Sequence, residues 1–223
     1  MQLDAYLEIG SKRVFAGALD WPGWCRSARD EHDAVTALAD YGSRYARVLR
    51  GTRLGFTDPR PSVGFRIRER LRGDATTDFG APSIPPAVDA APLTGKELDR
   101  YVRILRACWR TFDRAVQAAQ GVELTKGPRG GGRKLDAIVG HVVGAEAGYG
   151  RLIAATTPAV DGAEAIEARD DVRHAVVDAL ERAARDGLPE RGPRGGKRWT
   201  ARYFVRRAAW HVLDHAWEIE DRS

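Results

Sequence analysis

Three histidines have the residue type and the spacing of a metal site. His211 and His215 lie four residues apart in an apolar segment near the C-terminus, and His141 lies about 70 residues upstream in a second apolar segment. Both segments have helical periodicity, and residues at i and i+4 of a helix point the same way. With one imidazole from a facing helix they would form a set of three nitrogen ligands. Such a set leaves one position open, as catalytic metal sites do.

The alternative is that these histidines only pack. A lone histidine in a helix usually has no special role, and a pair at i and i+4 also arises by chance. The chain has only five histidines, and the other two, His32 and His174, lie in polar stretches near helix starts. An unpartnered buried imidazole is costly, so three histidines in apolar helices favour the metal-site hypothesis.

Three carboxylates close to these histidines are our candidate catalytic residues. Glu218 lies three positions after the second histidine of the pair, and Asp214 lies three positions after the first. Either could orient a ligand imidazole through its other ring nitrogen. Glu146 lies five positions after His141, roughly 140° further around a helix, so an acid or base role fits it less well. The alternative for each is a solvated helix face or an ion pair with a nearby arginine.

Two Gly-Pro-Arg-Gly-Gly segments, at 127–131 and 192–196, are a second unusual feature. Glycine lets backbone N–H groups approach an anion, and arginine supplies paired donors. Arg129, Arg133 and Arg194 are therefore candidate anion- or cofactor-binding residues. In a simple up-and-down bundle both loops would lie at one end, whereas up-down-down-up topology would separate them. The alternative is that both are flexible helix connections.

Composition restricts the class of protein. The chain has 223 residues, enough for one large domain or two small ones, with 43% hydrophobic and 30% charged residues. It has no apolar run of about 18 residues, so we expect no membrane span. The N-terminus lacks the features of a signal peptide, and the two cysteines form neither a disulfide framework nor a CxxC site. We therefore expect a cytoplasmic protein.

The charge pattern gives little support to a nucleic-acid partner. The net charge of +5 is spread along the chain, and a diffuse excess is a weak argument for nucleic-acid binding. Arginines alternate with apolar residues over 62–72 without aromatic residues between them, which is typical of the outer face of a sheet. We expect a small-molecule substrate, and the sequence leaves a homodimer open.

Periodicity divides the chain into two parts. Residues 2–9 and 13–19 predict a strand hairpin, 20–27 a rigid loop, 30–48 a helix with Asp30 as its N-cap, and 62–72 a further strand. This ββαβ order predicts an α+β module over 1–73. Residues 74–93 contain four prolines and predict a linker or an extended packing arm.

From Thr94 the period of the apolar residues changes to that of helices. Thr94 and Glu97 fit a capping box at the start of the first helix. Further helices are predicted over about 134–154, 171–185 and 200–221. Residues 94–223 therefore predict an all-α four-helix bundle, and bundle cores are common places for metal sites.

Residues 94–223 resemble the DinB-like superfamily of metalloenzymes in helix count, the histidine of the second helix and the His-x3-His of the last. The resemblance implies a four-helix bundle, often up-down-down-up, with a divalent metal held by His141, His211 and His215. We expect zinc, with nickel, manganese or iron as alternatives. The resemblance also implies thiol S-transferase, isomerase or hydrolase chemistry, in which a small thiol such as mycothiol, or water, is activated.

Residues 1–73 resemble HicB-like antitoxin domains. The resemblance rests on the predicted hairpin, on Asp20-x-Pro22-Gly23-x-Cys25-x-Ser27, and on the helix after Asp30. It implies an alternative function, in which a non-enzymatic binding or regulatory protein recognises a protein or nucleic acid. The three histidines favour the metal-dependent enzyme.

Overall fold

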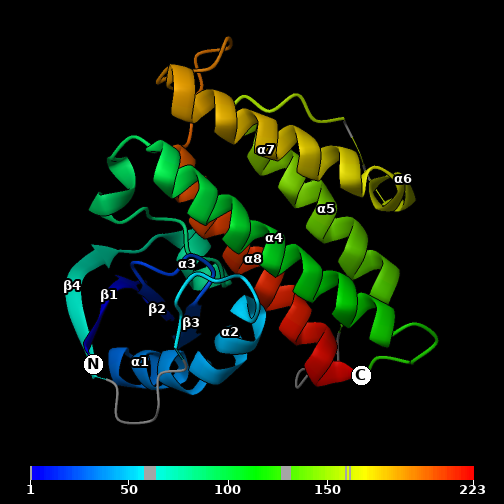
Figure 1. Ribbon diagram of the computed structural model, residues 1–223. Coiled ribbons are helices and arrows are strands. Elements are labelled where there is room, and N and C mark those ends of the chain that lie inside the picture. The colour runs from blue at the N-terminus through cyan, green and yellow to red at the C-terminus, as the bar shows by residue number, and fades with distance from the viewer. Residues whose placement is uncertain (1, 58–63, 127–131, 159, 161) are drawn as a thin grey trace.

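The computed structural model describes the chain except residues 1, 58–63, 127–131, 159 and 161. A mixed four-stranded sheet with helices is followed by a helical region (Figure 1), as the predicted fold class required. The elements of the N-terminal part are β1 (Gln2–Ile9), β2 (Val14–Ala18), β3 (Cys25–Ala28), α1 (Glu31–Asp40), α2 (Gly42–Leu49) and β4 (Gly64–Arg72).

The sheet has the order β3-β2-β1-β4. β2 pairs antiparallel with both β1 and β3, while β4 pairs parallel with β1. Two details differ from the sequence prediction. β3 lies within the segment predicted to be a rigid loop, because four residues are too few to show an alternation. The predicted single helix is two helices that meet at Tyr41.

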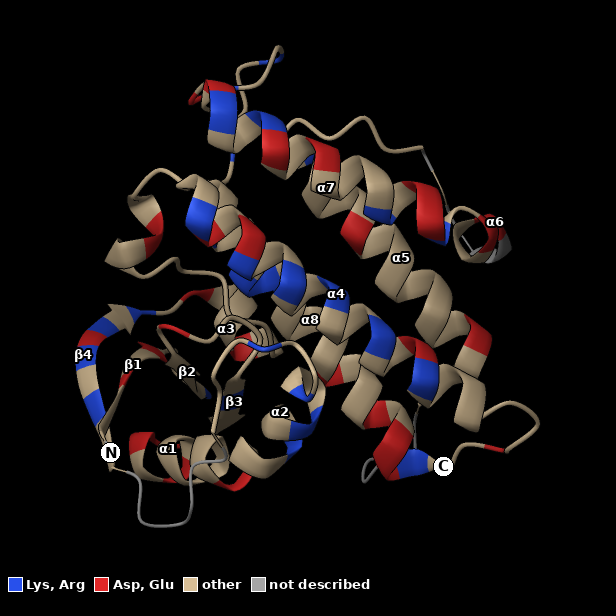
Figure 2. Cartoon of the chain, viewed as in Figure 1, with Lys and Arg blue, Asp and Glu red and all other residues tan. Residues whose placement is uncertain are grey.

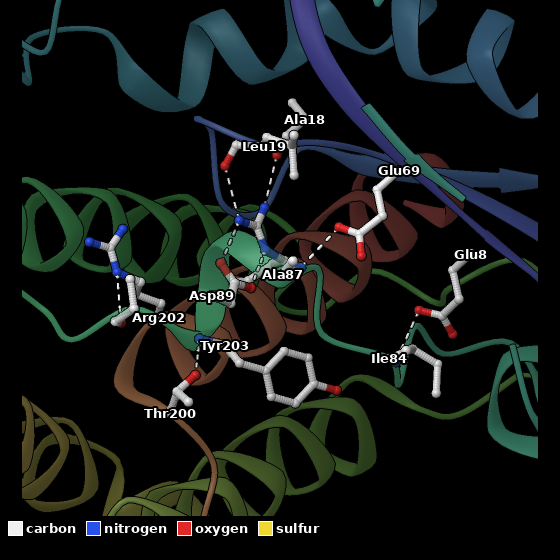
Figure 3. A network of polar contacts seen from close by, with 12 residues as sticks. Glu8, Ala18, Leu19, Glu69, Ile84, Ala87, Asp89, Thr200, Arg202 and Tyr203 are labelled. Atoms are coloured by element: carbon white, nitrogen blue, oxygen red, sulfur yellow. Dashed lines mark hydrogen bonds and ion pairs between the residues drawn. The ribbon is translucent and has the colours of Figure 1, made fainter. Parts of the chain in front are cut away.

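The proline-containing segment 74–93 is a packing arm rather than a free linker. It holds a short helix, α3 (Ala75–Phe79), and a 3-10 turn, η1 (Ala87–Ala90). Asp89 of this turn is buried and accepts two hydrogen bonds from Arg206, at 2.6 and 2.8 Å (Figure 3). The same guanidinium donates to the carbonyls of Ala18 and Leu19. The arm therefore joins β2 to the C-terminal helix.

Four long helices and one short helix make up the C-terminal part, and the long ones are the four predicted. They are α4 (Gly95–Ala118), α5 (Leu135–Leu152), α6 (Gly162–Glu167), α7 (Arg169–Asp186) and α8 (Ala201–Arg222). The predicted capping box forms between Thr94 and Glu97. The short α6 was not predicted, because six residues are too few to establish a helical period.

Contacts between helix ends define an up-down-down-up topology. Arg202 at the start of α8 bonds Glu97 at the start of α4, at 2.6 Å, so these helices are parallel. Arg222 at the end of α8 bonds the carbonyl of a residue just before α5, so α5 runs the opposite way. Arg182 near the end of α7 donates to Ala154, just beyond α5, so α7 runs with α5.

This topology puts the α4–α5 and α7–α8 connections at opposite ends of the bundle (Figure 1). Arg133 precedes α5 at one end, and Arg194 lies in the connection before α8 at the other. The hypothesis of a single anion-binding mouth formed by both loops is therefore wrong. The predicted residue Arg129 lies outside the described residues.

One cluster of buried hydrophobic residues runs through both parts of the chain. Gly23, with φ of 94°, lies so close to α8 that an added Cβ would be 3.1 Å from side-chain atoms of Ala209 and Leu213. Both acidic and basic residues lie along α4 and α7 (Figure 2). No helix within the described ranges is long and apolar enough to cross a bilayer.

Candidate metal centre

The candidate centre lies between α5 and α8. Thr200 caps α8 by accepting a hydrogen bond from the backbone N–H of Tyr203, which fixes where the helix begins. From there every fourth residue shares one face, and His211 and His215 lie on that face. His141 of α5 lies opposite, with its ring centroid 5.0 Å from each of theirs.

The three side chains offer one nitrogen each within 4.8 Å of one another. The Nε2 atoms of His141 and His211 are 3.2 Å apart. Two ligands that lie about 2.0–2.1 Å from one tetrahedral zinc ion are about 3.3 Å apart. The histidine spacing therefore fits a shared divalent metal ion, and the structure brings together the three residues that the sequence singled out.

Electrostatics keep two of these imidazoles neutral. Partial burial of the ring lowers the pKa of His141 to about 4, with smaller contributions from His215 and the Arg133 guanidinium. Burial also lowers the pKa of His211 well below its ordinary range, again with His215 as the next cause. A neutral imidazole presents a lone pair, which is the form that binds a metal.

A carboxylate orients the third ligand. His215 shares a hydrogen bond of 2.7 Å between Nδ1 and Glu218, and Arg222 holds the other carboxylate oxygen at 2.6 Å. These contacts lower the pKa of Glu218, the bond from His215 first. An ionised Glu218 accepts the Nδ1 proton and leaves Nε2 of His215 free as a ligand. Nδ1 of His211, by contrast, is buried with no hydrogen-bond partner.

Solvent reaches the centre from the α5 side. His141 is exposed, His215 is half-buried and His211 is buried at 6% exposure. The centre is thus closed at its base by α8 and accessible beside His141. This arrangement suits a ligand set that keeps one coordination position for water or a substrate.

The other two predicted carboxylates lie away from the histidines. Asp214 pairs with Arg26 at 2.9 Å, on the part of α8 that faces the N-terminal module. Glu146 is buried on α5, where it accepts a hydrogen bond from Trp109 and lies 4.0 Å from Arg173. Neither carboxylate bonds a histidine of the centre among the described contacts, so the structure supports neither catalytic assignment.

The two described arginines that were predicted to bind an anion lie in different places. Arg133 lies close enough to the histidines for its charge to lower the pKa of both His141 and His211. Arg194 lies in a small hairpin, closed by the bridge between Arg191 and Lys197, at the opposite end of the bundle. Of the two described arginines, Arg133 lies near the candidate centre and Arg194 does not.

Sequence reasoning missed Arg207 and Tyr149 as neighbours of the centre. Arg207 precedes His211 by one turn of α8, and its guanidinium lies 5.0 Å from the ring centroid of Tyr149. Tyr149 in turn lies 5.7 Å from His211, centroid to centroid. The spacing of four residues between Arg207 and His211 was a signal in the sequence, since it puts both on one helix face.

Comparison with known proteins adds one finding. A family model described as the DinB superfamily matches residues 104–219, more than half of the chain, and this range includes all three histidines and Glu218. No curated protein and no solved structure matches the chain. The N-terminal module lies outside the matched range.

Proposed function

The chain belongs to the DinB superfamily, and on that premise we propose that it is a divalent-metal-dependent enzyme acting on a small molecule. The reaction would be transfer, isomerisation or hydrolysis, with a small thiol or water as the activated group. The observation that supports this most is the cluster of His141, His211 and His215, whose ligand nitrogens lie within 4.8 Å of one another.

The protein's own residues would each have a distinct task. Neutral His141 and His211 would leave the full positive charge on the ion, and a bound divalent metal lowers the pKa of a coordinated water or thiol. Glu218 would hold the Nδ1 proton of His215, so that this ring keeps the tautomer needed for ligation. The buried base of the centre would limit the access of other water molecules.

We propose zinc as the metal, with nickel, manganese or iron as alternatives. Imidazole ligands suit zinc, nickel and iron, whereas manganese prefers oxygen ligands. A low-molecular-weight thiol such as mycothiol is the proposed co-substrate. The structure describes no cysteine that could replace such a thiol at the centre. Cys25 and Cys108 are both buried, and burial raises the pKa of Cys25 to about 12.

A cobalt titration tests the proposal. Protein loaded with Co²⁺ would be titrated with glutathione or mycothiol while its absorption spectrum is recorded, because a thiolate bound to Co²⁺ gives a charge-transfer band in the near ultraviolet. We expect that band in the wild type and not in His141→Ala. A thiol that leaves the spectrum unchanged would remove thiol activation, and hydrolysis assays on the zinc form would then test activation of water.

For residues 1–73 we propose a HicB-like fold, supported by the β1–β2 hairpin and by the helix that Asp30 caps. On the arginine-faced strand β4, Arg66 and Arg68 both pair with Asp4. Asp4 offsets one of these two positive charges, which weakens the case for nucleic-acid binding at this face.

A further inference from the structure

Arg207 is a buried cation without a counter-ion. Three arginines are buried among the described residues, Arg173, Arg206 and Arg207, and the last is 8% exposed. Arg173 pairs with Asp113 through two hydrogen bonds, and Arg206 pairs with Asp89. Across the part of the chain that the structure describes, Arg207 has neither a hydrogen bond nor an ion pair, and its Nη1 is fully buried without a partner.

Aromatic rings hold this guanidinium in place. It lies 4.6 Å from the ring centroid of Trp210 and 5.0 Å from that of Tyr149. Cation–π contacts of this kind orient an arginine but do not use its N–H donors. A buried charge normally has both a partner and satisfied donors. The donors of Arg207 therefore remain available for a group that is not part of this chain.

The position of Arg207 connects it to the candidate metal centre. It precedes His211 by four residues, which is about 6 Å along the helix axis. The Tyr149 ring that the guanidinium contacts lies 5.7 Å from the ring of His211, which in turn lies 5.0 Å from the ring of His141, centroid to centroid. Arg133 acts on both histidine rings from the start of α5. Glu218, the carboxylate at the centre, is engaged by His215 and Arg222 and does not pair with Arg207.

We propose that Arg207 binds a carboxylate group of the substrate, which makes the substrate a small organic acid. This inference rests on the proposed function, since the other end of the acid would react at the centre held by His211. A planar guanidinium binds a carboxylate through two parallel hydrogen bonds. A single cation between aromatic walls suits this flat, singly charged group better than a phosphate. Arg207 and His211 are separated by about one helical turn, and an acid of about four carbon atoms can span this distance.

Succinate, with succinamide as its uncharged analogue, is the probe for this site. Zinc-loaded and metal-free protein would each be titrated with succinate by calorimetry, as wild type, Arg207→Met and Arg110→Met. Arg110 is exposed on α4, outside α5 and α8, so its substitution makes the same change in net charge without altering a residue of the candidate centre. We expect at least tenfold weaker succinate binding in Arg207→Met, unchanged binding in Arg110→Met, and no binding of succinamide.

Thermal unfolding separates this role from a structural one. An unpartnered buried cation destabilises the fold, so Arg207→Met should melt at the same or a higher temperature than the wild type. Arg206→Met, which leaves Asp89 without its partner, should melt lower. A lower melting temperature for Arg207→Met with unchanged succinate binding would overturn the inference, and so would a wild type that binds no succinate.

Metal content distinguishes failure of this inference from failure of the proposed function. Arg207→Met should keep the metal content of the wild type, because Arg207 is not a ligand. If the wild type holds no metal but metal-free protein still binds succinate through Arg207, the carboxylate site stands and the proposed function fails. If metal is bound and succinate binding does not depend on Arg207, the inference alone fails.

Discussion

Glu218 orients the candidate metal ligand His215 through one hydrogen bond to its Nδ1. Replacing it in Glu218→Gln removes the anionic acceptor at Nδ1 of His215, although the side chain keeps its size. Removal of such a partner typically weakens metal affinity about 10–100-fold. We expect a loss in this range for zinc, measured by competition with a chromogenic chelator.

Asp214→Asn is the matched control, because Asp214 lies on the same helix and also three positions after a histidine. Its partner is Arg26, so zinc affinity should stay within about twofold of the wild type. Equal losses in the two variants would contradict a specific role for Glu218.

Glu146 should contribute a pH dependence of stability that is separate from the metal centre. Burial raises its pKa to about 7, well above its ordinary value of 4.5. Between these values the folded state keeps a proton that the unfolded state has released, so the wild type loses stability as the pH rises from 4.5 to 7. Glu146→Gln does not titrate and still accepts from Trp109.

Urea unfolding of both proteins at pH 5 and pH 8 checks this expectation. The free energy of unfolding of Glu146→Gln relative to the wild type should increase by roughly 2–3 kcal/mol between the two pH values. If the free energy of unfolding of Glu146→Gln relative to the wild type is the same at pH 5 and pH 8, Glu146 is ionised in the folded protein.

Among the site residues, helical periodicity was enough to predict the histidines and Glu218. It also selected Asp214, which accepts a hydrogen bond from Arg26, because a spacing of three residues fixes the direction around a helix but not which neighbour lies there. The neighbour of Asp214 is Arg26, 188 residues away in sequence. Arg207 was missed for the related reason that an absent counter-ion becomes visible only when the contacts are known.

The element that fixes α8 against the sheet is the turn η1, through Asp89 and Arg206. Breaking a buried ion pair leaves an uncompensated charge, which costs about 3–5 kcal/mol. We therefore expect Asp89→Asn to lower the free energy of unfolding by an amount in this range, measured with urea. Asp99→Asn breaks an exposed pair with Arg103 on α4 and should change stability by less than about 0.5 kcal/mol. Similar effects from both substitutions would contradict the role given to the arm.

Long elements were predictable and short ones were not. The apolar period over 15 or more residues identified α4, α5, α7 and α8, whereas β3 and α6 were too short for any period. The sequence did not decide the topology of the bundle, because the up-and-down and the up-down-down-up arrangements bury the same apolar helix faces. The topology is decided by contacts such as that of Arg202 with Glu97, which joins helix ends that are far apart in the sequence.

At the scale of the whole molecule, the sheet and the helices share one buried core. The sequence predicted separate domains over 1–73 and 94–223, and this division remains a prediction. A shared core predicts that calorimetry of the full chain shows one cooperative transition. Residues 94–223 alone should be less stable, since the face of α8 near Ala209 and Leu213 would be exposed. Two well-separated transitions would contradict this expectation and favour independent domains.

The central claim is that three histidines from two helices hold one divalent metal ion. Elemental analysis of the purified, untagged protein by mass spectrometry tests it most directly, beside His141→Ala and the control His174→Ala. We expect about one zinc, nickel, manganese or iron ion per chain in the wild type and in His174→Ala, and none in His141→Ala. Equal metal content in all three proteins, or no metal in the wild type after reconstitution, would contradict it.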